Sequence, residues 1–359
     1  MLPVNRVPRN NWYVAAFSAE VSTVPLARTI CGDAVALFRT AAGRLAAVED
    51  RCIHRGMPLT HGGQCSGEII RCPYHGLEYD AEGTCVKIPG QDRIPARAKL
   101  ITYPIIEQDE LIWIWMGDRL KAAGTVPPEH PVHRDARWAR ASTIFLHIEA
   151  DWQLVNDNLL DLTHLPFVHA RTIGSDAVSH TANANVETRR IERRIEYNIH
   201  MPNVDPPPMY RQAFPFRGKI DRWQEMVFVP GVFRLWTGGM DAGTGALDGK
   251  RDGGVQFKTL HAITPSTATS CYYHFTRSIN FGLEDSDLHR RLHEASVMTV
   301  EMEDKHVIEA VQQRSLQYPD RPFIDTRWDV GPRHARRIVE EMVEEEEMQS
   351  NSSRPMTSV

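Results

Sequence analysis

The chain has 359 residues, of which 42% are hydrophobic, so it is long enough to form two domains with separate buried cores. Its formal net charge of -5 provides no basic field, and we therefore expect it to bind neither nucleic acid nor anionic lipid. No stretch has the about eighteen consecutive apolar residues that cross a bilayer, and the start lacks a signal-peptide core, which predicts a cytoplasmic protein.

Residues 12–115 alternate short apolar runs with Gly, Pro and Asp. The runs at 34–38 and 111–115 are examples, and their lengths are typical of strands in an antiparallel sheet. This pattern predicts an N-terminal all-β domain over residues 1–118. A segment rich in Pro, Ala and charged residues follows at 119–140 and is predicted to connect this domain to the next.

Two pairs of potential metal ligands lie in the predicted β domain, and each pair has one Cys followed by one His. Cys52 and His54 form the first pair, and Cys72 and His75 form the second. Two thiolates on one iron and two neutral imidazoles on the other hold a Rieske [2Fe–2S] cluster. A zinc site uses the same residue types, but its two Cys usually stand together and its two His together. The order of the residues predicts a Rieske cluster, with zinc as the alternative.

A second domain over residues 141–343 is predicted to combine strands with helices. Residues 141–148 form a strand-like run, and several more such runs lie between 186 and 280. The predicted fold class is therefore α+β. Residues 344–359 are acidic and then rich in Ser and Asn, which predicts a disordered tail.

His164 and His169 lie on either side of Pro166, at the end of a helix predicted over residues 152–165. In one continuous helix, residues five apart would point about 140° apart. Because Pro166 breaks the helix, the two imidazoles can converge on one ion. Two His and one carboxylate leave three positions open on Fe(II), so the pair predicts a mononuclear iron site that takes one acid from elsewhere.

A second helix, predicted from residue 286 to about 315, offers that acid. Its apolar positions form one seam, at Val297, Val300, Val307 and Val311. Asp304 falls in the middle of this seam, and a buried carboxylate is costly unless it is paired or bound to metal. Asp304 is therefore the predicted third ligand. Glu301 and Glu303 fall off the seam and are predicted to be solvated.

Two polar residues precede the His pair at helical spacing. Asp161 lies one turn before His164, where its carboxylate is predicted to accept a hydrogen bond from the imidazole and fix the tautomer. Asn158 lies one turn earlier on the same face. It either supports the metal site or caps the helix.

These motifs resemble the oxygenase components of Rieske non-haem iron monooxygenases, in the group that contains vanillate O-demethylase, dicamba O-demethylase and toluenesulfonate methyl-monooxygenase. The resemblance extends from about residue 8 to 340. It is carried by the Cys–His pairs and by the segments Asn158 to His169, Glu303 to Lys305, Asn11 to Ala16 and Leu111 to Asp118. It implies a helix-grip (START-like) second domain, one [2Fe–2S] cluster and one mononuclear Fe(II) per subunit, and a homotrimer.

The resemblance also implies the reaction. Electrons come from a separate NAD(P)H-dependent flavin and iron–sulfur reductase, with or without a ferredoxin, because this chain has no flavin or nicotinamide motif. They pass through the Rieske cluster and His75 to Asp161 of the neighbouring subunit, and then to the mononuclear iron. With O2, the site hydroxylates a methoxy carbon, with release of formaldehyde, or a methyl carbon of an aromatic acid.

Two alternatives stay open. A ring cis-dihydroxylating or ring-hydroxylating oxygenase would use the same metals and differ only in how the ring is held. A Rieske electron-transfer protein without oxygenase activity would leave His164, His169 and Asp304 without a metal. The sequence does not identify the aromatic acid.

His261 is the candidate for substrate binding. It lies in a strand-like run over residues 257–263, where alternation places it on the same face as Phe257 and Thr259. An acid group in a mostly apolar pocket needs a few polar donors. His261 is predicted either to donate to this group or to be a packed core histidine.

Overall fold

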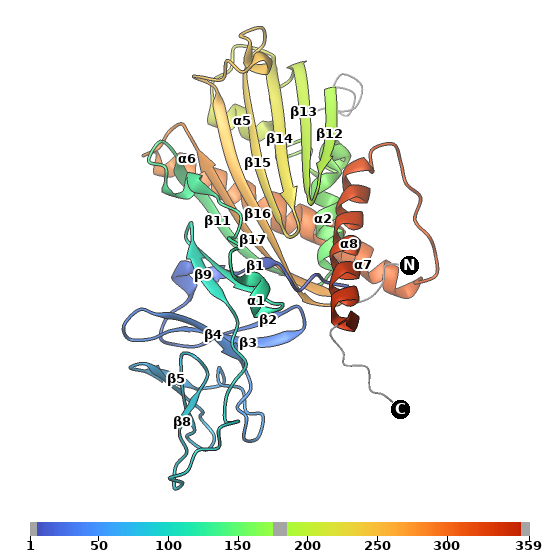
Figure 1. Ribbon diagram of the computed structural model, residues 1–359. Coiled ribbons are helices and arrows are strands. Elements are labelled where there is room, and N and C mark those ends of the chain that lie inside the picture. Colours follow the sequence, from blue (N-terminus) through green and yellow to red (C-terminus); the bar gives the residue numbers. More distant parts are fainter. Residues whose placement is uncertain (1–5, 175–184, 353–359) are drawn as a thin grey trace. The chain divides into compact units, whose positions relative to one another are not determined.

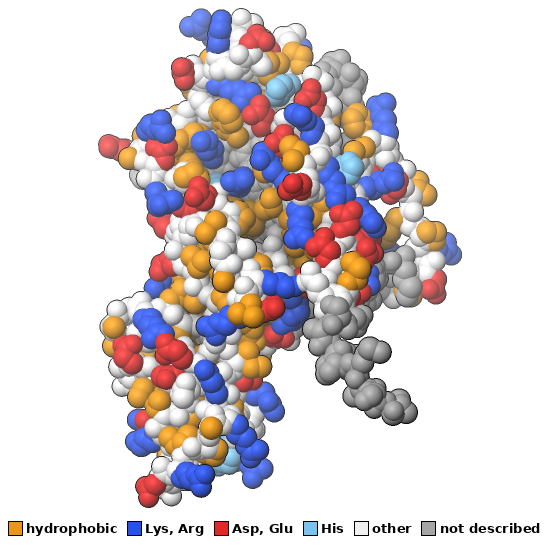
Figure 2. All heavy atoms as spheres, in the orientation of Figure 1, with side chains coloured by type: hydrophobic (Ala, Val, Ile, Leu, Met, Phe, Trp, Pro, Cys, Tyr) orange, Lys and Arg blue, Asp and Glu red, His pale blue; other side chains and the backbone are white. Residues whose placement is uncertain are grey.

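The computed structural model describes residues 6–174 and 185–352 (Figure 1). It divides into two compact units. Of the described residues, the first contains 7–129, 264–268 and 346–352, and the second contains 130–174, 185–263 and 269–345. On the face drawn in Figure 2, basic and acidic side chains are interspersed. None of the described helices is long and apolar enough to cross a membrane.

The first unit is built from three antiparallel sheets. One sheet has the order β1 (Trp12–Phe17), β10 (Leu111–Trp115), β9 (Ile105–Gln108). The second has the order β2 (Leu26–Ile30), β3 (Asp33–Arg39), β4 (Leu45–Glu49). The third has the order β5 (Gln64–Ser66), β6 (Ile69–Arg71), β7 (Glu78–Asp80), β8 (Cys85–Lys87). The predicted all-β character of this region is confirmed. Among the described residues 6–129, the one α-helix is the short α1 (Arg119–Ala122), which follows the last strand.

Two apolar clusters form the core of the first unit. One contains Tyr13, Leu37, Ile112 and Ile114. The other contains Phe38, Leu59, Ile70 and Tyr79, and it also includes Cys52 and Cys72. The two cysteines are therefore held by the packing of the core.

The second unit contains one antiparallel sheet of seven strands. Their order across the sheet is β11 (Ala139–Ile148), β17 (Ser270–Ile279), β16 (Val255–Thr267), β15 (Val232–Asp241), β14 (Ile220–Val229), β13 (Arg194–Val204), β12 (Asn185–Ile191). Buried and partly exposed residues alternate along β13, as expected for a strand with one covered face. Figure 1 shows α2 (Trp152–Leu160), α6 (Ser286–Val297) and α7 (Lys305–Gln317) along one face of the sheet. The predicted α+β class is confirmed.

The helix predicted over residues 152–165 is shorter than expected. α2 ends at Leu160, and Asp161 has the non-helical angles φ -108° and ψ 88°. A 3-10 turn (Leu162–His164) and the short α3 (Leu165–Val168) follow. Pro166 lies in the first turn of α3, where no intrahelical N–H is needed, so it begins a helical turn here and does not end one.

The predicted long helix from residue 286 has an irregular centre. Between α6 and α7, Met298–Asp304 form a π-helix, whose i to i+5 hydrogen bonds widen the turn. The predicted apolar seam is therefore wrong, because Val307 and Val311 are 38% and 39% exposed. The buried stripe instead runs through Val300, Asp304, Ile308 and Gln312.

The last described element is α8 (Val330–Ser352), a helix that the sequence pattern did not predict. The prediction of a disordered tail from residue 344 is wrong for residues 344–352, because these are helical. The rest of that predicted tail, 353–359, lies outside the described residues. Arg336 of α8 forms an ion pair with Asp157 of α2, and this contact joins the last helix to the helix that precedes the His pair.

Candidate metal centres

Cys52 and Cys72 begin two loops with the same hydrogen-bond pattern in the first unit. In each loop the Cys amide donates to the carbonyl five residues later, and a Gly amide four residues after the Cys donates back to the Cys carbonyl, at 2.8 to 3.1 Å. These glycines are Gly56, with φ +73°, and Gly76, with φ +72°. Glycine adopts this left-handed conformation at little cost, so each tight loop depends on its glycine.

The two loops bring the four predicted cluster residues together. Both cysteines are buried at 1% exposure, whereas His54 and His75 are exposed and their rings lie 4.5 Å apart. The Tyr79 hydroxyl lies 3.1 Å from Cys52 Sγ. Two inner thiolates and two outer imidazoles match the donor set of a Rieske cluster, and the exposed His54 and His75 would hold one iron of such a cluster near the surface, where electrons could leave.

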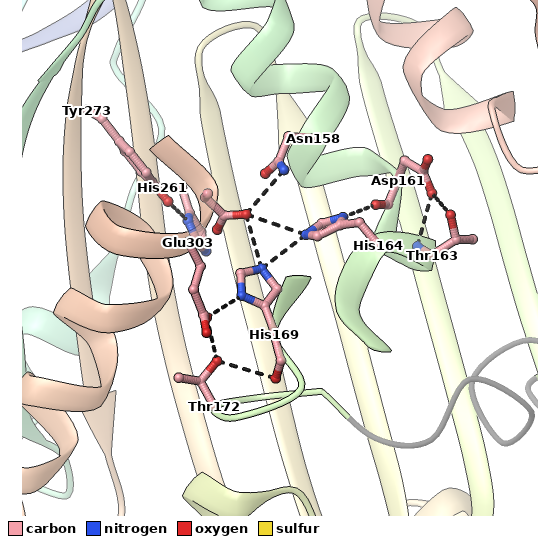
Figure 3. A network of polar contacts seen from close by, with 10 residues as sticks. Asn158, Asp161, Thr163, His164, His169, Thr172, His261, Tyr273 and Glu303 are labelled. Carbon is pink, nitrogen blue, oxygen red and sulfur yellow. Dashed lines mark hydrogen bonds and ion pairs between the residues drawn. The ribbon is translucent and has the colours of Figure 1, made fainter. Parts of the chain in front are cut away.

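A second group of ligands lies in the second unit. The ligand atoms of His164, His169 and Asp304 all lie within 4.8 Å of one another. The two Nε2 atoms are 3.1 Å apart, and Asp304 Oδ1 lies 3.0 Å from His169 Nε2 and 3.5 Å from His164 Nε2 (Figure 3). The structure therefore brings together the two His and the one carboxylate that the sequence paired.

The outer nitrogen of each imidazole is already occupied. His164 Nδ1 donates to the backbone carbonyl of Asp161 at 2.5 Å, and His169 Nδ1 donates to Glu303 Oε2 at 2.7 Å. With the protons on Nδ1, both Nε2 lone pairs face each other and Asp304. Three lone-pair donors that converge in a buried place are stabilised by a cation, and this donor set fits a divalent iron.

Electrostatics support the same conclusion. Burial alone would raise the pKa of Asp304, but hydrogen bonds from His164 and His169, whenever their Nε2 atoms carry protons, hold the pKa well below the ordinary value for Asp, and a cation in place of those protons acts in the same direction. Asp304 is therefore an anion at neutral pH although it is only 6% exposed. A buried carboxylate is retained in a protein when a positive partner or a metal compensates it.

Glu303 is a residue of the site that sequence reasoning missed. It is 9% exposed and not solvated, and besides His169 Nδ1 its Oε2 accepts a hydrogen bond from Thr172 Oγ1 at 2.8 Å. The prediction failed because the π-helix turns two consecutive residues, Glu303 and Asp304, toward the same His. Only its adjacency to Asp304 could have signalled this role.

The two polar residues before the His pair act differently from the prediction. Asp161 binds His164 through its backbone carbonyl, whereas its carboxylate Oδ1 accepts from the Thr163 amide at 3.0 Å and hydroxyl at 2.5 Å. The predicted hydrogen bond from the imidazole to the carboxylate is therefore wrong. Asn158 does not cap the helix. Its Nδ2 donates to Asp304 Oδ1 at 3.2 Å.

His261 lies beside this group, as Figure 3 shows. It is 7% exposed, and its Nδ1 lies 2.5 Å from the Tyr273 hydroxyl, while its Nε2 has no partner in the described structure. When the Tyr273 hydroxyl donates to Nδ1, the imidazole proton lies on Nε2, and Nε2–H is then an unused donor.

Comparison with known proteins identifies the family. Residues 11–104 match the Rieske [2Fe-2S] domain, and residues 148–345 match the vanillate O-demethylase oxygenase C-terminal domain. The toluene-4-sulfonate monooxygenase system iron-sulfur subunit of Comamonas testosteroni is 36% identical over 94% of this chain and 97% of its own length. The vanillate O-demethylase oxygenase subunit of a Pseudomonas strain is 33% identical over 95% of this chain and 96% of its own length.

A solved structure has the same fold. The crystal structure of dicamba monooxygenase bound to dicamba superposes with a TM-score of 0.86 at 30% identity, and the match covers 95% of this chain and 98% of that one. The agreement extends over both units of the chain. The chain therefore belongs to the vanillate O-demethylase family of Rieske non-haem iron oxygenases, and it is an oxidoreductase that uses a [2Fe–2S] cluster and a mononuclear iron.

Proposed function

We propose that this chain is the terminal oxygenase component of a multicomponent monooxygenase that hydroxylates a methoxy or methyl carbon of an aromatic acid. The observation that carries the proposal is the convergence of His164 Nε2, His169 Nε2 and Asp304 Oδ1 within 4.8 Å. The names of the relatives support it, since vanillate, dicamba and toluene-4-sulfonate are all aromatic acids. A hydroxylated methoxy carbon is a hemiacetal, which collapses to a phenol and formaldehyde.

The proposal assigns a role to each ligand. The [2Fe–2S] cluster is held by Cys52, His54, Cys72 and His75. The mononuclear iron is held by His164, His169 and Asp304. When bound by two His and one carboxylate, this iron keeps open positions for O2. Around it, the Asp161 carbonyl and the Glu303 carboxylate orient the two imidazoles, and the Asn158 amide holds the Asp304 carboxylate.

We further propose that the chain acts as a homotrimer with a separate reductase. Since His54 and His75 are exposed, the cluster edge is free to approach another subunit. In the trimer, Asp161 would connect the neighbouring subunit's His75 to the mononuclear iron, through its backbone bond to His164. Thr163 orients the Asp161 carboxylate for this contact.

Metal and product analysis test the proposal. We expect about three irons per chain, two from the cluster and one mononuclear, and a Rieske electron-paramagnetic signal after reduction. With a surrogate reductase and a panel of methoxy- and methyl-arene acids, we expect formaldehyde or a benzylic alcohol. About two irons and no product would indicate an electron carrier. A cis-diol would indicate ring dihydroxylation, and zinc in a colourless protein would exclude both metal centres.

His261 is proposed to donate its free Nε2–H to the acid group of the substrate. His261→Ala should raise KM for the acid about tenfold to a hundredfold, which corresponds to the loss of a hydrogen bond to a charged group. A neutral amide or ester of the same arene should lose much less. Equal losses for both substrates would indicate a packing defect, and no loss for either would place His261 away from the substrate.

A further inference from the structure

The helix-covered face of the seven-stranded sheet holds a buried positive charge, Arg277 of β17. It is 7% exposed, and no carboxylate of the described residues lies within ion-pair distance of it. In the described structure, Arg277 donates hydrogen bonds from Nη1 alone, to Ser296 Oγ at 2.8 Å and to Met209 Sδ at 3.2 Å. Both acceptors are neutral. The fork of donors on this guanidinium is therefore only partly used.

Two aromatic rings form walls around this guanidinium. Its central carbon lies 5.2 Å from the centre of the Phe275 ring and 5.8 Å from that of the Phe257 ring. Such cation–π contacts are weaker than the hydration that a buried guanidinium loses. The charge of Arg277 is therefore only partly compensated by the protein, which is typical of a site that takes an anion from outside.

Two further buried polar atoms lack a partner in the described structure and lie against the same rings. The Tyr210 hydroxyl is unpaired, and the Tyr210 ring lies 5.2 Å from Phe257. His261 Nε2 is unpaired, and the His261 ring lies 5.3 Å from Phe275. Arg277 stands next to both rings. Tyr210 and His261 thus each contact one of the two rings that flank Arg277.

Arg277 and His261 differ in charge at neutral pH, and they therefore have different roles. Burial lowers the pKa of Arg277 to about 10, so the guanidinium stays charged at neutral pH. Burial, followed by the charge of Arg277, lowers the pKa of His261 to about 3, so this imidazole is neutral. Any net attraction for an anion at this place thus comes from Arg277, and His261 supplies a neutral donor.

We propose that Arg277, Tyr210 and His261 together form the binding site for the acid group of the substrate. Arg277 is the residue that makes the enzyme select an anionic arene, a carboxylate or a sulfonate. The inference rests on the proposed function, because it assumes that the substrate binds between this sheet face and the His164, His169 and Asp304 site. His261 lies near both places, because Figure 3 shows it beside the metal ligands and its ring lies 5.3 Å from the Phe275 ring that Arg277 also contacts.

The test measures binding without turnover. Isothermal titration calorimetry on the iron-loaded enzyme would use benzoate and benzenesulfonate as anions and benzamide as the neutral control. For Arg277→Met, which keeps the length and removes the charge, we expect the Kd of both anions to rise about tenfold to a hundredfold. The Kd of benzamide should change less than about threefold, because only the charge-assisted bonds are lost.

Two further variants distinguish the loss of an anion contact from a folding defect in Arg277→Met. Arg277→Lys keeps the charge and loses the fork, so it should bind the anions more tightly than Arg277→Met. Tyr210→Phe removes only the unpaired hydroxyl and should weaken both anions about threefold to tenfold. Iron content and circular dichroism show whether each variant is folded.

The outcomes separate this inference from the proposed function. The proposed anion-binding site would be contradicted if the Arg277 variants lost equal affinity for benzoate and benzamide. It would also be contradicted if the parent enzyme bound none of the anions. If the Arg277 variants do not fold, an unchanged anion Kd in Tyr210→Phe would overturn it as well. A different outcome is that the variants lose anion binding selectively and yet the enzyme yields no formaldehyde or benzylic alcohol from any methoxy- or methyl-arene. That result would support the anion-binding site and contradict the proposed function.

Discussion

At the scale of single residues, the backbone and the side chain of Asp161 have separate tasks. The carbonyl receives His164 Nδ1–H, and the carboxylate is held by Thr163. A substitution that changes only the carboxylate therefore leaves the support of the His ligand in place. This separation makes the proposed electron-transfer role testable without loss of the iron.

We expect Asp161→Asn to keep the mononuclear iron and to slow electron transfer at least about tenfold to a hundredfold. The physical reason is that, in the proposed trimer, the carboxylate is the charged link between the two metal centres, while the amide of Asn carries no charge. Stopped-flow absorbance would follow reoxidation of the reduced cluster with substrate and O2. Asp157→Asn is the control on the same helix and should reoxidise at the parent rate. Loss of iron in Asp161→Asn would show instead that the side chain supports the ligand.

At the scale of elements, β14 and β15 meet so closely that only glycine fits at one position. A Cβ on Gly238 of β15 would lie 2.1 Å from Trp223 Cζ2 and 2.5 Å from the carbonyl oxygen of Val255. Trp223 is fully buried, and the Arg251 guanidinium lies 4.5 Å from its ring centre. The indole therefore has little room to move.

Gly238→Ala should accordingly destabilise the protein. Overpacking of this kind costs about 1–3 kcal/mol, which corresponds to a fall of about 2–12 °C in Tm for a domain of this size. Gly218→Ala is the matched control, because a Cβ there meets no atom within 4 Å. Thermal unfolding followed by circular dichroism compares the two. An unchanged Tm in Gly238→Ala would show that Trp223 can shift.

At the scale of the whole molecule, the contact of α8 with α2 makes stability depend on pH. Asp157 lies against Arg336, yet burial outweighs this partner and raises the pKa of the carboxyl to about 6. Between about pH 4 and pH 6, the folded protein keeps a proton that the unfolded chain has already released. Ionisation of Asp157 therefore lowers the stability as pH rises through this window.

Asp157→Asn removes that titration, so its Tm relative to the parent should rise as the pH is raised from 5 to 8. At pH 5 most of the native Asp157 is protonated and resembles Asn. At pH 8 the parent carries the ionised carboxylate, and Asn does not. Asp287→Asn, on the exposed surface of α6, controls for the loss of one charge. A constant difference in Tm across this range would show that Arg336 keeps Asp157 ionised.

The sequence by itself determined the family and the groups of ligands. Cys52, His54, Cys72 and His75 lie in two short segments, and His164 and His169 lie five residues apart, so their types and spacing are readable without a fold. Asp304 was assigned from a helical seam that does not exist as predicted. The carboxylate is nevertheless buried, because the π-helix moved the buried stripe to residues four apart that include Asp304.

Only the tertiary structure decided what surrounds these ligands. The burial of Glu303 depends on one wide helical turn, and the pairing of His164 with a carbonyl depends on where α2 ends. The convergence of Tyr210, Arg277 and His261 depends on a helix and two strands that meet across the second unit. The types and spacing of the metal ligands are local properties of the chain. Burial and unpaired hydrogen-bond donors arise from contacts between distant segments, and no local sequence pattern encodes these contacts.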